Sequence, residues 1–405
     1  MTRQRLAIVV SHPIQHFVPL YRALAARSDI TLKVFFATRI GVDRTFDAEM
    51  NTAYAWDGNL LDGYDHAFLD EADRIKQVSF RGVNNPSIAA ALREFEPTAV
   101  LIYGYAQLTA LRALTWSRLH RVPVLMAGDG DAVPRSKNTR ALFRSAFLRL
   151  LMSQVSAVLA VGDQNETFWD KMGVSAAKRF RSPFSIDETI YRHAQANRAA
   201  LRSATRRRFG IADAAFVFLS VGKLSARKRA ADLLAASVRI KTDRPVHLLF
   251  CGDGSERATL TQMAAEAKVP SSFSGFVNLD RLPAAYCAAD TLVIPSGHDP
   301  HPLVGSEACA IGLPLIVSDR VGLIGDSDIA QPGFNALTYP CGDVDALAAA
   351  MQRLLDDPAL HAAMAQASLT VFDQTCMRHS VEGVLAALDH VSPVKAPTYQ
   401  SLPAS

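Results

Sequence analysis

Short apolar runs alternate with longer segments of helical periodicity in the first half of the chain. Apolar runs at 6–10 (LAIVV) and 31–37 flank a helical pattern at 18–27. Strand, helix and strand at this spacing are typical of a parallel sheet covered by helices. The alternation continues with strands predicted at 99–103, 122–126 and 157–161 and helices at 107–120 and 164–172. The pattern predicts an N-terminal α/β domain over residues 1–187.

The alternation starts again after an Ala- and Arg-rich stretch at 188–214, which we interpret as a connection between domains. Strands are predicted at 216–221, 247–251, 272–274, 291–294, 315–318 and 336–339, and helices at 230–241, 257–267, 282–288, 305–310 and 344–355. We therefore expect two Rossmann-like, doubly wound α/β domains facing across a cleft. The second domain covers 215–375, and 376–405 is expected to be a C-terminal helix (380–390) and a flexible tail. Ligands of open parallel sheets bind beyond the carboxyl ends of strands, so the chemistry is expected in the loops there.

Composition limits the class of protein. The chain has 405 residues, of which 49% are hydrophobic and 20% charged, and this excludes wholesale disorder. No apolar run reaches the roughly 18–20 residues that span a bilayer, and the run at 6–10 is too short for a secretory signal. The five cysteines are widely spaced and contain no C-x-x-C pair, which favours reduced, buried thiols in a cytoplasmic protein: Cys251, Cys287, Cys309, Cys341 and Cys376.

A basic stretch lies at 135–150. The net charge is only +4, yet residues 101–150 hold eight Lys or Arg and two Asp or Glu residues. Arg140 and Arg144 are four residues apart, and Arg149 follows. Apolar residues accompany them at helical spacing: Leu142, Phe143, Phe147 and Leu150. A basic amphipathic helix suits an anionic membrane surface, and the alternative is an ordinary domain helix with a solvated face. No nucleic-acid motif accompanies it, so no nucleic-acid partner is expected.

Candidate chemistry follows three predicted strands of the second domain. Gly222, Lys223 and Lys228 come directly after the strand at 216–221. Two cations at a strand end can clamp a diphosphate, whereas without an anion they would oppose the dipole of the next helix. Gly252 and Gly254 allow a tight turn after the next strand, which is a weak signal alone. Phe276 and Val277 follow a third strand, where Phe276 either borders a nucleobase or belongs to the core.

Two acidic residues flank the start of a predicted helix. Asp299 lies in the loop after the strand at 291–294, and Glu307 follows eight residues later. Carboxylates accept hydrogen bonds from sugar hydroxyls, and the backbone N–H groups of Leu303 and Val304 can bind phosphate at the helix start. The alternative for Glu307 is a carboxylate favoured by the helix dipole.

The ordered set of these motifs resembles the retaining family-4 glycosyltransferases of GT-B fold, over about 216–355. The resemblance implies that Lys223 and Lys228 contact the donor diphosphate, where the first position is usually Arg. It implies that Glu307 holds the ribose hydroxyls, that Asp299 faces the donor sugar in place of the usual Glu, and that Phe276 and Val277 border the base. The activity implied is metal-independent, hexosyltransferase-like transfer from a nucleotide-sugar, which is a substrate, with no cofactor and no metal site.

The first domain matches this family only in layout. Asp129 or Asp131, in the loop after 122–126, is a candidate replacement for the family's sugar-contacting His, and the alternative for Asp129 is a turn residue. His12 and His16 follow the first strand, where they either pack at a helix entry or bind the acceptor.

The expected acceptor is a lipid-linked or cell-surface glycan intermediate, as in lipopolysaccharide or exopolysaccharide synthesis. The expected location is the cytoplasm, with peripheral binding at the inner face of the cell membrane. Three alternatives stay open: a nucleotide-sugar epimerase, a nucleotide-sugar hydrolase, and a non-catalytic nucleotide-sugar-binding homologue. A dinucleotide oxidoreductase is disfavoured because neither domain's first strand leads into G-x-G-x-x-G.

Overall fold

The structure is a computed structural model that describes residues 3–42, 45–47, 52–54, 59–131 and 139–392. Of residues 45–47, 52–54 and 139–145 it describes only the backbone. The predicted tail beyond 392 and the first part of the basic stretch, 135–138, therefore lie outside the described residues. The same holds for the side chains of Arg140, Leu142, Phe143 and Arg144.

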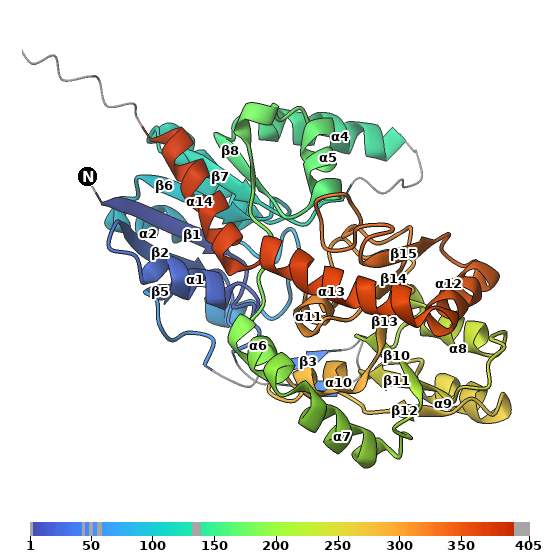
Figure 1. Cartoon of the computed structure of the whole chain (residues 1–405). Coiled ribbons are helices and arrows are strands. Elements are labelled where there is room, and N and C mark those ends of the chain that lie inside the picture. Colours follow the sequence, from blue (N-terminus) through green and yellow to red (C-terminus); the bar gives the residue numbers. More distant parts are fainter. Residues whose placement is uncertain (1–2, 43–44, 48–51, 55–58, 132–138, 393–405) are drawn as a thin grey trace, which may run out of the picture.

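The first domain is built on a parallel sheet of seven strands (Figure 1). In spatial order the strands are β5 (His66–Phe68), β2 (Ile30–Phe36), β1 (Gln4–Val10), β6 (Ala99–Tyr103), β7 (Val124–Ala127), β8 (Ala157–Ala160) and β9 (Arg179–Arg181). The helices of this domain are α1 (Val18–Ala25), α2 (Ile88–Phe95), α3 (Leu108–Leu119), α4 (Thr139–Met152) and α5 (Asp163–Lys171). A short antiparallel pair, β3 (Thr45–Asp47) and β4 (Thr52–Tyr54), lies apart from the main sheet. Buried strands that read as continuous apolar runs, such as β1, are typical of such a doubly covered sheet.

The second domain repeats this design with six parallel strands. In spatial order they are β12 (Ser271–Phe273), β11 (Val246–Cys251), β10 (Phe216–Val221), β13 (Thr291–Ile294), β14 (Leu315–Ser318) and β15 (Ala336–Tyr339). Its helices are α8 (Ala230–Ser237), α9 (Arg257–Glu266), α10 (Leu282–Ala288), α11 (Val304–Ile311), α12 (Val344–Asp356) and α13 (Pro358–Gln374). The predicted fold class, two Rossmann-like α/β domains, is confirmed.

The segment after the first domain forms two helices that pack on the second. These are α6 (Glu188–Ala196) and α7 (Arg198–Phe209), which contact α10 and α11. Arg206 of α7 is 1% exposed, and its guanidinium donates to the Asp290 carboxylate at 2.9 Å. Asp290 also accepts from Arg202 at 2.8 Å. A paired, hydrogen-bonded buried charge of this kind fixes the helix on the domain.

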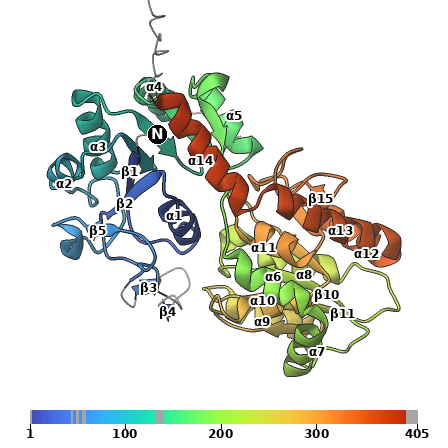
Figure 2. The same ribbon diagram turned by 60° about the vertical axis from the view of Figure 1, so that its left-hand side comes forward.

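The last helix returns to the first domain. Helix α14 (Met377–Val391, red in Figures 1 and 2) lies against β8, β9 and α1. Val384, Ala387 and Leu388 of α14 are buried in the same apolar cluster as Leu6 and Ile8 of β1. The chain therefore crosses between the domains twice, and the two crossings lie side by side, because the backbone N–H of Met377 donates to the Glu188 carboxylate.

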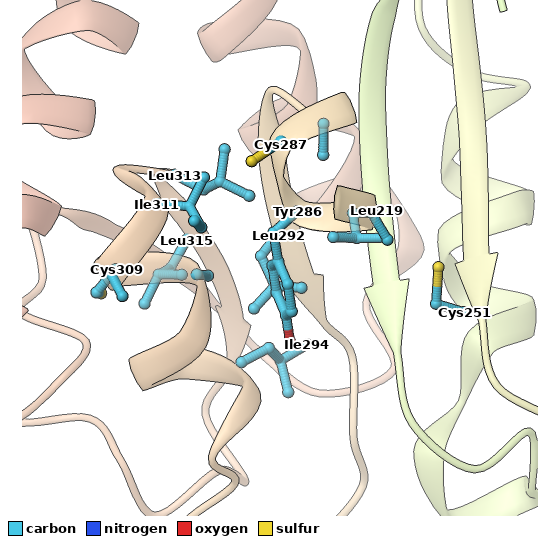
Figure 3. Close-up of a cluster of buried hydrophobic side chains, with 14 of the residues drawn as sticks. Leu219, Cys251, Tyr286, Cys287, Leu292, Ile294, Cys309, Ile311, Leu313 and Leu315 are labelled. Atoms are coloured by element: carbon cyan, nitrogen blue, oxygen red, sulfur yellow. The ribbon is translucent and has the colours of Figure 1, made fainter. Parts of the chain in front are cut away.

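The core of the second domain lies on both faces of its sheet. Figure 3 shows Leu219 of β10, Tyr286 and Cys287 of α10, and Leu292 and Ile294 of β13 in one buried cluster. The cysteines are all unpaired thiols; four are buried, whereas Cys341 is half-buried. Within the described residues, no helix is both long and apolar enough to cross a membrane.

Candidate functional site

Two adjoining pockets lie where the domains face each other. The first, the β10–β13 pocket, has a volume of about 420 Å³. It is lined by Gln15, Val221, Gly222, Lys223, Arg227, Lys228, Cys251, Gly252, Phe276, Val277, Leu279, Leu282, Leu303, Val304 and Glu307. The second, the interdomain pocket, has about 390 Å³. It is lined by Val10, Ser11, Ile14, His16, Phe17, Tyr103, Gly104, Gly128, Asp129, Phe184, His301 and Leu303. Leu303 borders both, so the two pockets are neighbours.

The glycines of the β10–β13 pocket allow its loops to pack backbone against backbone. Gly222 donates to the carbonyl of Cys251 at 2.9 Å, and Leu224 donates to that of Asp253 at 2.9 Å. A Cβ on Gly252 would lie 1.8 Å from the Gly222 oxygen, and one on Gly254 would lie 2.4 Å from the Leu224 oxygen. Both have a positive φ, of 151° and 157°. Gly254 does not line either pocket, so its observed role is loop packing.

Lys223, Arg227 and Lys228 place three basic side chains on one wall. Lys228 ends a short 3₁₀ turn (Ala226–Lys228) that precedes α8. Its ammonium group pairs with the carboxylate of Asp299, and both side chains are mostly buried. Asp299 itself is held by backbone bonds, because its carbonyl accepts from Gly322 at 2.8 Å. The structure thus brings together two predicted residues from separate loops, although Asp299 itself does not line the pocket.

Glu307 projects from the first turn of α11 into a buried environment. It is 6% exposed, and the hydroxyl of Tyr286 donates to its Oε2 atom. Burial raises the pKa of Glu307, and the hydroxyls of Tyr286 and Tyr191 oppose that rise. Tyr191 comes from α6 and lies near the carboxylate, whereas the hydrogen bond that the described side chains make to it is that of Tyr286. A raised pKa beside a pocket is typical of a functional carboxyl group.

Part of the lining of the same pocket is apolar. Phe276 and Val277 line it, as predicted, after β12. Leu303 and Val304 form the start of α11, where the first backbone N–H groups of a helix lack intrahelical partners. Such N–H groups bind anions well. The pocket therefore combines an apolar surface, cations, helix-terminal amides and one buried carboxyl group.

The interdomain pocket has aromatic walls from the first domain. The rings of Phe17 and Tyr103 lie 4.2 Å apart between centroids, and those of Phe17 and Phe184 lie 5.7 Å apart. Asp129 and His16, both predicted from sequence, line this pocket. His12 lines neither pocket, and its Nδ1 atom lies 2.8 Å from the Ser11 hydroxyl.

Both histidines are uncharged near neutral pH. Burial lowers the pKa of His12 to about 4. Burial, with the neighbouring His12, lowers the pKa of His16 to about 3. The His16 ring packs on Phe17 at 4.3 Å and on Phe184 at 5.2 Å. Both readings of His16 thus have support, since the ring packs and also borders the pocket.

The domains are joined beside this pocket by reciprocal hydrogen bonds. The Asp328 carboxylate accepts from the backbone of Asp163, at the start of α5, at 2.8 Å. In return the Asp163 carboxylate accepts from the backbone and hydroxyl of Ser327 at 2.9 and 2.6 Å. Asp328 also contacts His301 Nε2 at 2.9 Å. Gly162 allows this approach, because a Cβ there would lie 1.9 Å from the Asp328 Oδ2 atom.

Sequence reasoning missed several residues of the site. It did not single out Gln15, Arg227, Tyr286 or His301. Arg227 directly precedes Lys228 and His301 lies two residues after Asp299, so their places in the sequence could have signalled them, whereas Tyr286 is recognisable only from packing. No group of three or more His, Cys, Asp or Glu side chains suited to a metal ion occurs among the described residues.

The predicted basic helix forms α4, over Thr139–Met152. Its described C-terminal part exposes Phe147 and Leu150, at 50% and 67% of their surfaces. The Arg149 guanidinium donates to the carbonyl of Lys171 at 3.1 Å. An exposed apolar pair beside an Arg fits either alternative for this stretch.

Two facing Rossmann-like domains with the pockets between them define the GT-B fold. A crystal structure of the Anabaena protein HepE in complex with UDP matches 96% of this chain and 100% of that chain, with a TM-score of 0.71 and 17% identity. Residues 202–370 match the family described as glycosyl transferases group 1. Residues 202–370, which make up most of the second domain, are therefore similar to that family, and the predicted resemblance to GT-B glycosyltransferases is confirmed at this level.

Two curated relatives match this part of the chain. A glycogen synthase of Mycobacterium tuberculosis is 34% identical over 160 residues, which is 39% of this chain and 37% of that protein. A lipopolysaccharide core biosynthesis glycosyltransferase of Rhizobium meliloti is 36% identical over 151 residues, which is 36% of this chain and 41% of that protein. The chain thus spans about two fifths of the length of these relatives.

Proposed function

We propose that the protein is a retaining glycosyltransferase that moves a hexose-type sugar from a nucleotide-sugar donor to an acceptor hydroxyl. The observation that carries the proposal is the β10–β13 pocket, where Lys223, Lys228 and the buried Glu307 meet. The match of residues 202–370 to the glycosyl transferases group 1 family supports glycosyl transfer, and the UDP bound by the Anabaena protein supports a nucleoside diphosphate as the ligand.

Each part of the pocket has a role in this proposal. Glu307 accepts hydrogen bonds from the ribose hydroxyls, and Phe276 and Val277 border the base. Lys223, Lys228 and the first amides of α11 hold the diphosphate. As the bond from the anomeric carbon to the diphosphate oxygen breaks, negative charge grows on that oxygen, and these fixed positive groups stabilise it. They take the place of a metal ion, and no cofactor is needed.

The Lys228–Asp299 pair suits this reaction. Without a ligand, Asp299 neutralises Lys228, so a mostly buried cation is not left alone. When the diphosphate binds, Lys228 gains a second anion, and Asp299 lies beside the donor sugar. The acceptor oxygen attacks on the face that the diphosphate leaves, and its proton passes to the released diphosphate. Attack on that face retains the anomeric configuration.

We take residues 1–187 as the acceptor-side domain, 188–214 as the connection, 215–375 as the donor-side domain and 376–405 as the closing helix and tail. The acceptor in this proposal is a lipid-linked or cell-surface glycan intermediate, which the Rhizobium relative's role in lipopolysaccharide core synthesis supports. The proposed location is the cytoplasmic face of the membrane. Arg149, Phe147 and Leu150 of α4 would contact anionic lipids, and neutralising Arg140, Arg144 and Arg149 together should reduce sedimentation with anionic liposomes. Equal sedimentation would support the ordinary domain helix.

The experiment that tests the donor site is a thermal-shift screen of nucleotide sugars, followed by calorimetry on the best ligand. Glu307→Ala should abolish measurable binding, whereas Glu266→Ala, at an exposed position of α9, should leave it unchanged. Unchanged affinity of Glu307→Ala would remove the site assignment. Product analysis by NMR then separates the alternatives. A retained glycoside supports transfer, free sugar or an epimer indicates a hydrolase or epimerase, and binding without turnover indicates a non-catalytic homologue.

A further inference from the structure

The walls of the interdomain pocket suit a ring with apolar faces. Phe17, Tyr103 and Phe184 present aromatic surfaces, and Leu303 closes the side toward the β10–β13 pocket. Pockets of this kind bind by apolar contact and are made specific by a few polar groups. The polar residues that line this one are Ser11, His16, Tyr103, Asp129 and His301.

The charge of this pocket distinguishes it from the neighbouring one. Its lining residues, all within the described part of the chain, include no Lys and no Arg. His16 carries no charge near neutral pH. Asp129, in the loop after β7, adds a carboxylate to the lining of the pocket. An anionic ligand would meet no cation here and would be repelled by Asp129, whereas an uncharged hydroxyl can donate to that carboxylate.

His301 supplies the second polar group, and its tautomer can be inferred from its neighbours. The side chain is 2% exposed, and its Nε2 atom lies 2.9 Å from Asp328 Oδ1. The Asp328 carboxylate also accepts from the backbone N–H groups of Asp163 and Ile329, at 2.8 and 2.7 Å. Because the Asp328 carboxylate can only accept hydrogen bonds, the imidazole nitrogen that contacts it, Nε2, carries the proton and donates it as a hydrogen bond. Nδ1 then carries a lone pair.

That second nitrogen is buried and has no hydrogen-bond partner among the described residues. A buried polar atom without a partner costs free energy unless a ligand or water satisfies it. The ring also stands edge-on to Phe184, with centroids 5.8 Å apart, so it belongs to the aromatic wall.

We propose that the interdomain pocket is the acceptor subsite, that it takes an uncharged polyhydroxylated ring, and that His301 Nδ1 accepts a hydrogen bond from one of its hydroxyls. Asp328 acts as the positioning residue that fixes the His301 tautomer. The inference rests on the proposed function, because it names the substrate class on the acceptor side of the same cleft. The pocket would discriminate against phosphorylated and carboxylated rings, because Asp129 repels them and its lining contains no Lys or Arg.

The test is saturation-transfer NMR on the full chain, in the presence of the nucleoside diphosphate that binds most tightly. The probes are glucose, mannose and myo-inositol, each compared with its monophosphate. Neutral rings should give a saturation-transfer signal, which shows binding, and monophosphates should give none. His301→Ala should weaken the neutral ring at least about tenfold, which is the effect of one lost hydrogen bond. His379→Ala, on α14 and outside both pockets, is the matched control and should change nothing.

Two results would overturn the inference: monophosphates that bind better than the neutral rings, or no transfer from any neutral ring. Undiminished binding to His301→Ala would remove the assigned role of Nδ1. If His301→Ala does not fold, Asp129→Asn decides, since it should raise monophosphate binding relative to neutral rings, and an unchanged ratio contradicts the charge argument. Nucleoside diphosphate affinity is measured in parallel by calorimetry. If the wild-type chain binds no nucleotide, the proposed function fails, whereas intact nucleotide binding with the wrong ring preference refutes only this inference.

Discussion

Removing one hydroxyl group, in Tyr286→Phe, tests how the buried carboxyl group of Glu307 is held. The Tyr286 side chain is fully buried in the α10 core, and its hydroxyl donates to Glu307 Oε2. Phenylalanine keeps the ring and its packing, so the change removes the hydrogen bond and little else. Glu307 then lacks one of the donors that oppose the effect of burial on its pKa.

The magnitude follows from the state of the carboxyl group. A hydrogen bond to a neutral acid contributes about 0.5–1.5 kcal/mol, and one to a carboxylate contributes about 1.5–3 kcal/mol. The difference, about 1–1.5 kcal/mol, corresponds to a further rise of roughly one unit in the pKa of Glu307. Because the native pKa is already raised, Glu307 contributes stability at low pH that is lost as pH rises through that pKa. In the variant this loss continues to a higher pH.

The assay is urea unfolding by far-UV circular dichroism without nucleotide, at intervals from pH 4.5, the ordinary pKa of a glutamate, up to the highest pH at which the protein folds reversibly. The free energy difference between wild type and Tyr286→Phe should be constant below the native pKa of Glu307 and should grow above it, to about 2–3 kcal/mol. Tyr339→Phe is the matched control in the same domain. Tyr339 is 3% exposed, and its hydroxyl has no hydrogen bond among the described residues, so its removal should cost little at any pH.

A difference that does not grow at any pH above the ordinary range of a glutamate would refute the reasoning, because a carboxylate that loses its donor must respond to pH. Equal costs for Tyr286→Phe and Tyr339→Phe would also refute it. In either case the hydrogen bond from Tyr286 would contribute little to stability, and the position of Glu307 would depend on α11 alone.

Three further changes test other parts of the site. Gly252→Ala should destabilise the second domain by more than 3 kcal/mol in the same unfolding assay, since its Cβ would overlap the Gly222 oxygen; a stable, nucleotide-binding variant would contradict the loop packing. Lys228→Ala should lower kcat by at least tenfold with a smaller change in donor KM, and an unaffected kcat would remove its leaving-group role. The wild type should lose stability as pH falls from about 6.5 toward 3, because unfolded His16 takes up a proton that the folded protein, with a His16 pKa of about 3, does not. His16→Gln should reduce this loss by roughly 1–2 kcal/mol at pH 5 in the same unfolding assay. An unchanged pH dependence would show that folded His16 takes up its proton readily.

The central strands of both sheets could be predicted closely from the sequence. β6, β10, β13 and β14 begin and end where the apolar runs do, because buried parallel strands tolerate few polar residues. The edge strands β5 and β9 could not, since three half-buried residues carry no period. Helix α13 was also missed. Its Ala-rich sequence shows no clear apolar stripe, and its start depends on the Asp357 side chain, which caps the Leu360 N–H.

The residues of the candidate site also divide into those that could be predicted from the sequence and those that could not. Residues in post-strand loops, such as Lys223 and Phe276, could be predicted because the loop position and the motif order both carry information. Tyr286 and Asp328 could not, because their partners come from packing between elements that the sequence leaves unplaced. Tyr286 meets Glu307 across two helices, and Asp328 meets α5 across the domain boundary. Roles that depend on tertiary contacts leave no local pattern.

The boundary between the domains connects acceptor binding to the relative position of the two halves. Asp328 binds both His301, in the wall of the interdomain pocket, and the backbone at the start of α5. The return contact, from Ser327 to Asp163, holds the same loop from the other side. If the domains separated, Asp328 would lose the α5 donor and His301 would leave the aromatic wall that Phe184 provides. The pocket that we assign to the acceptor is therefore complete only while the domains are together, which is also when water is excluded from the donor.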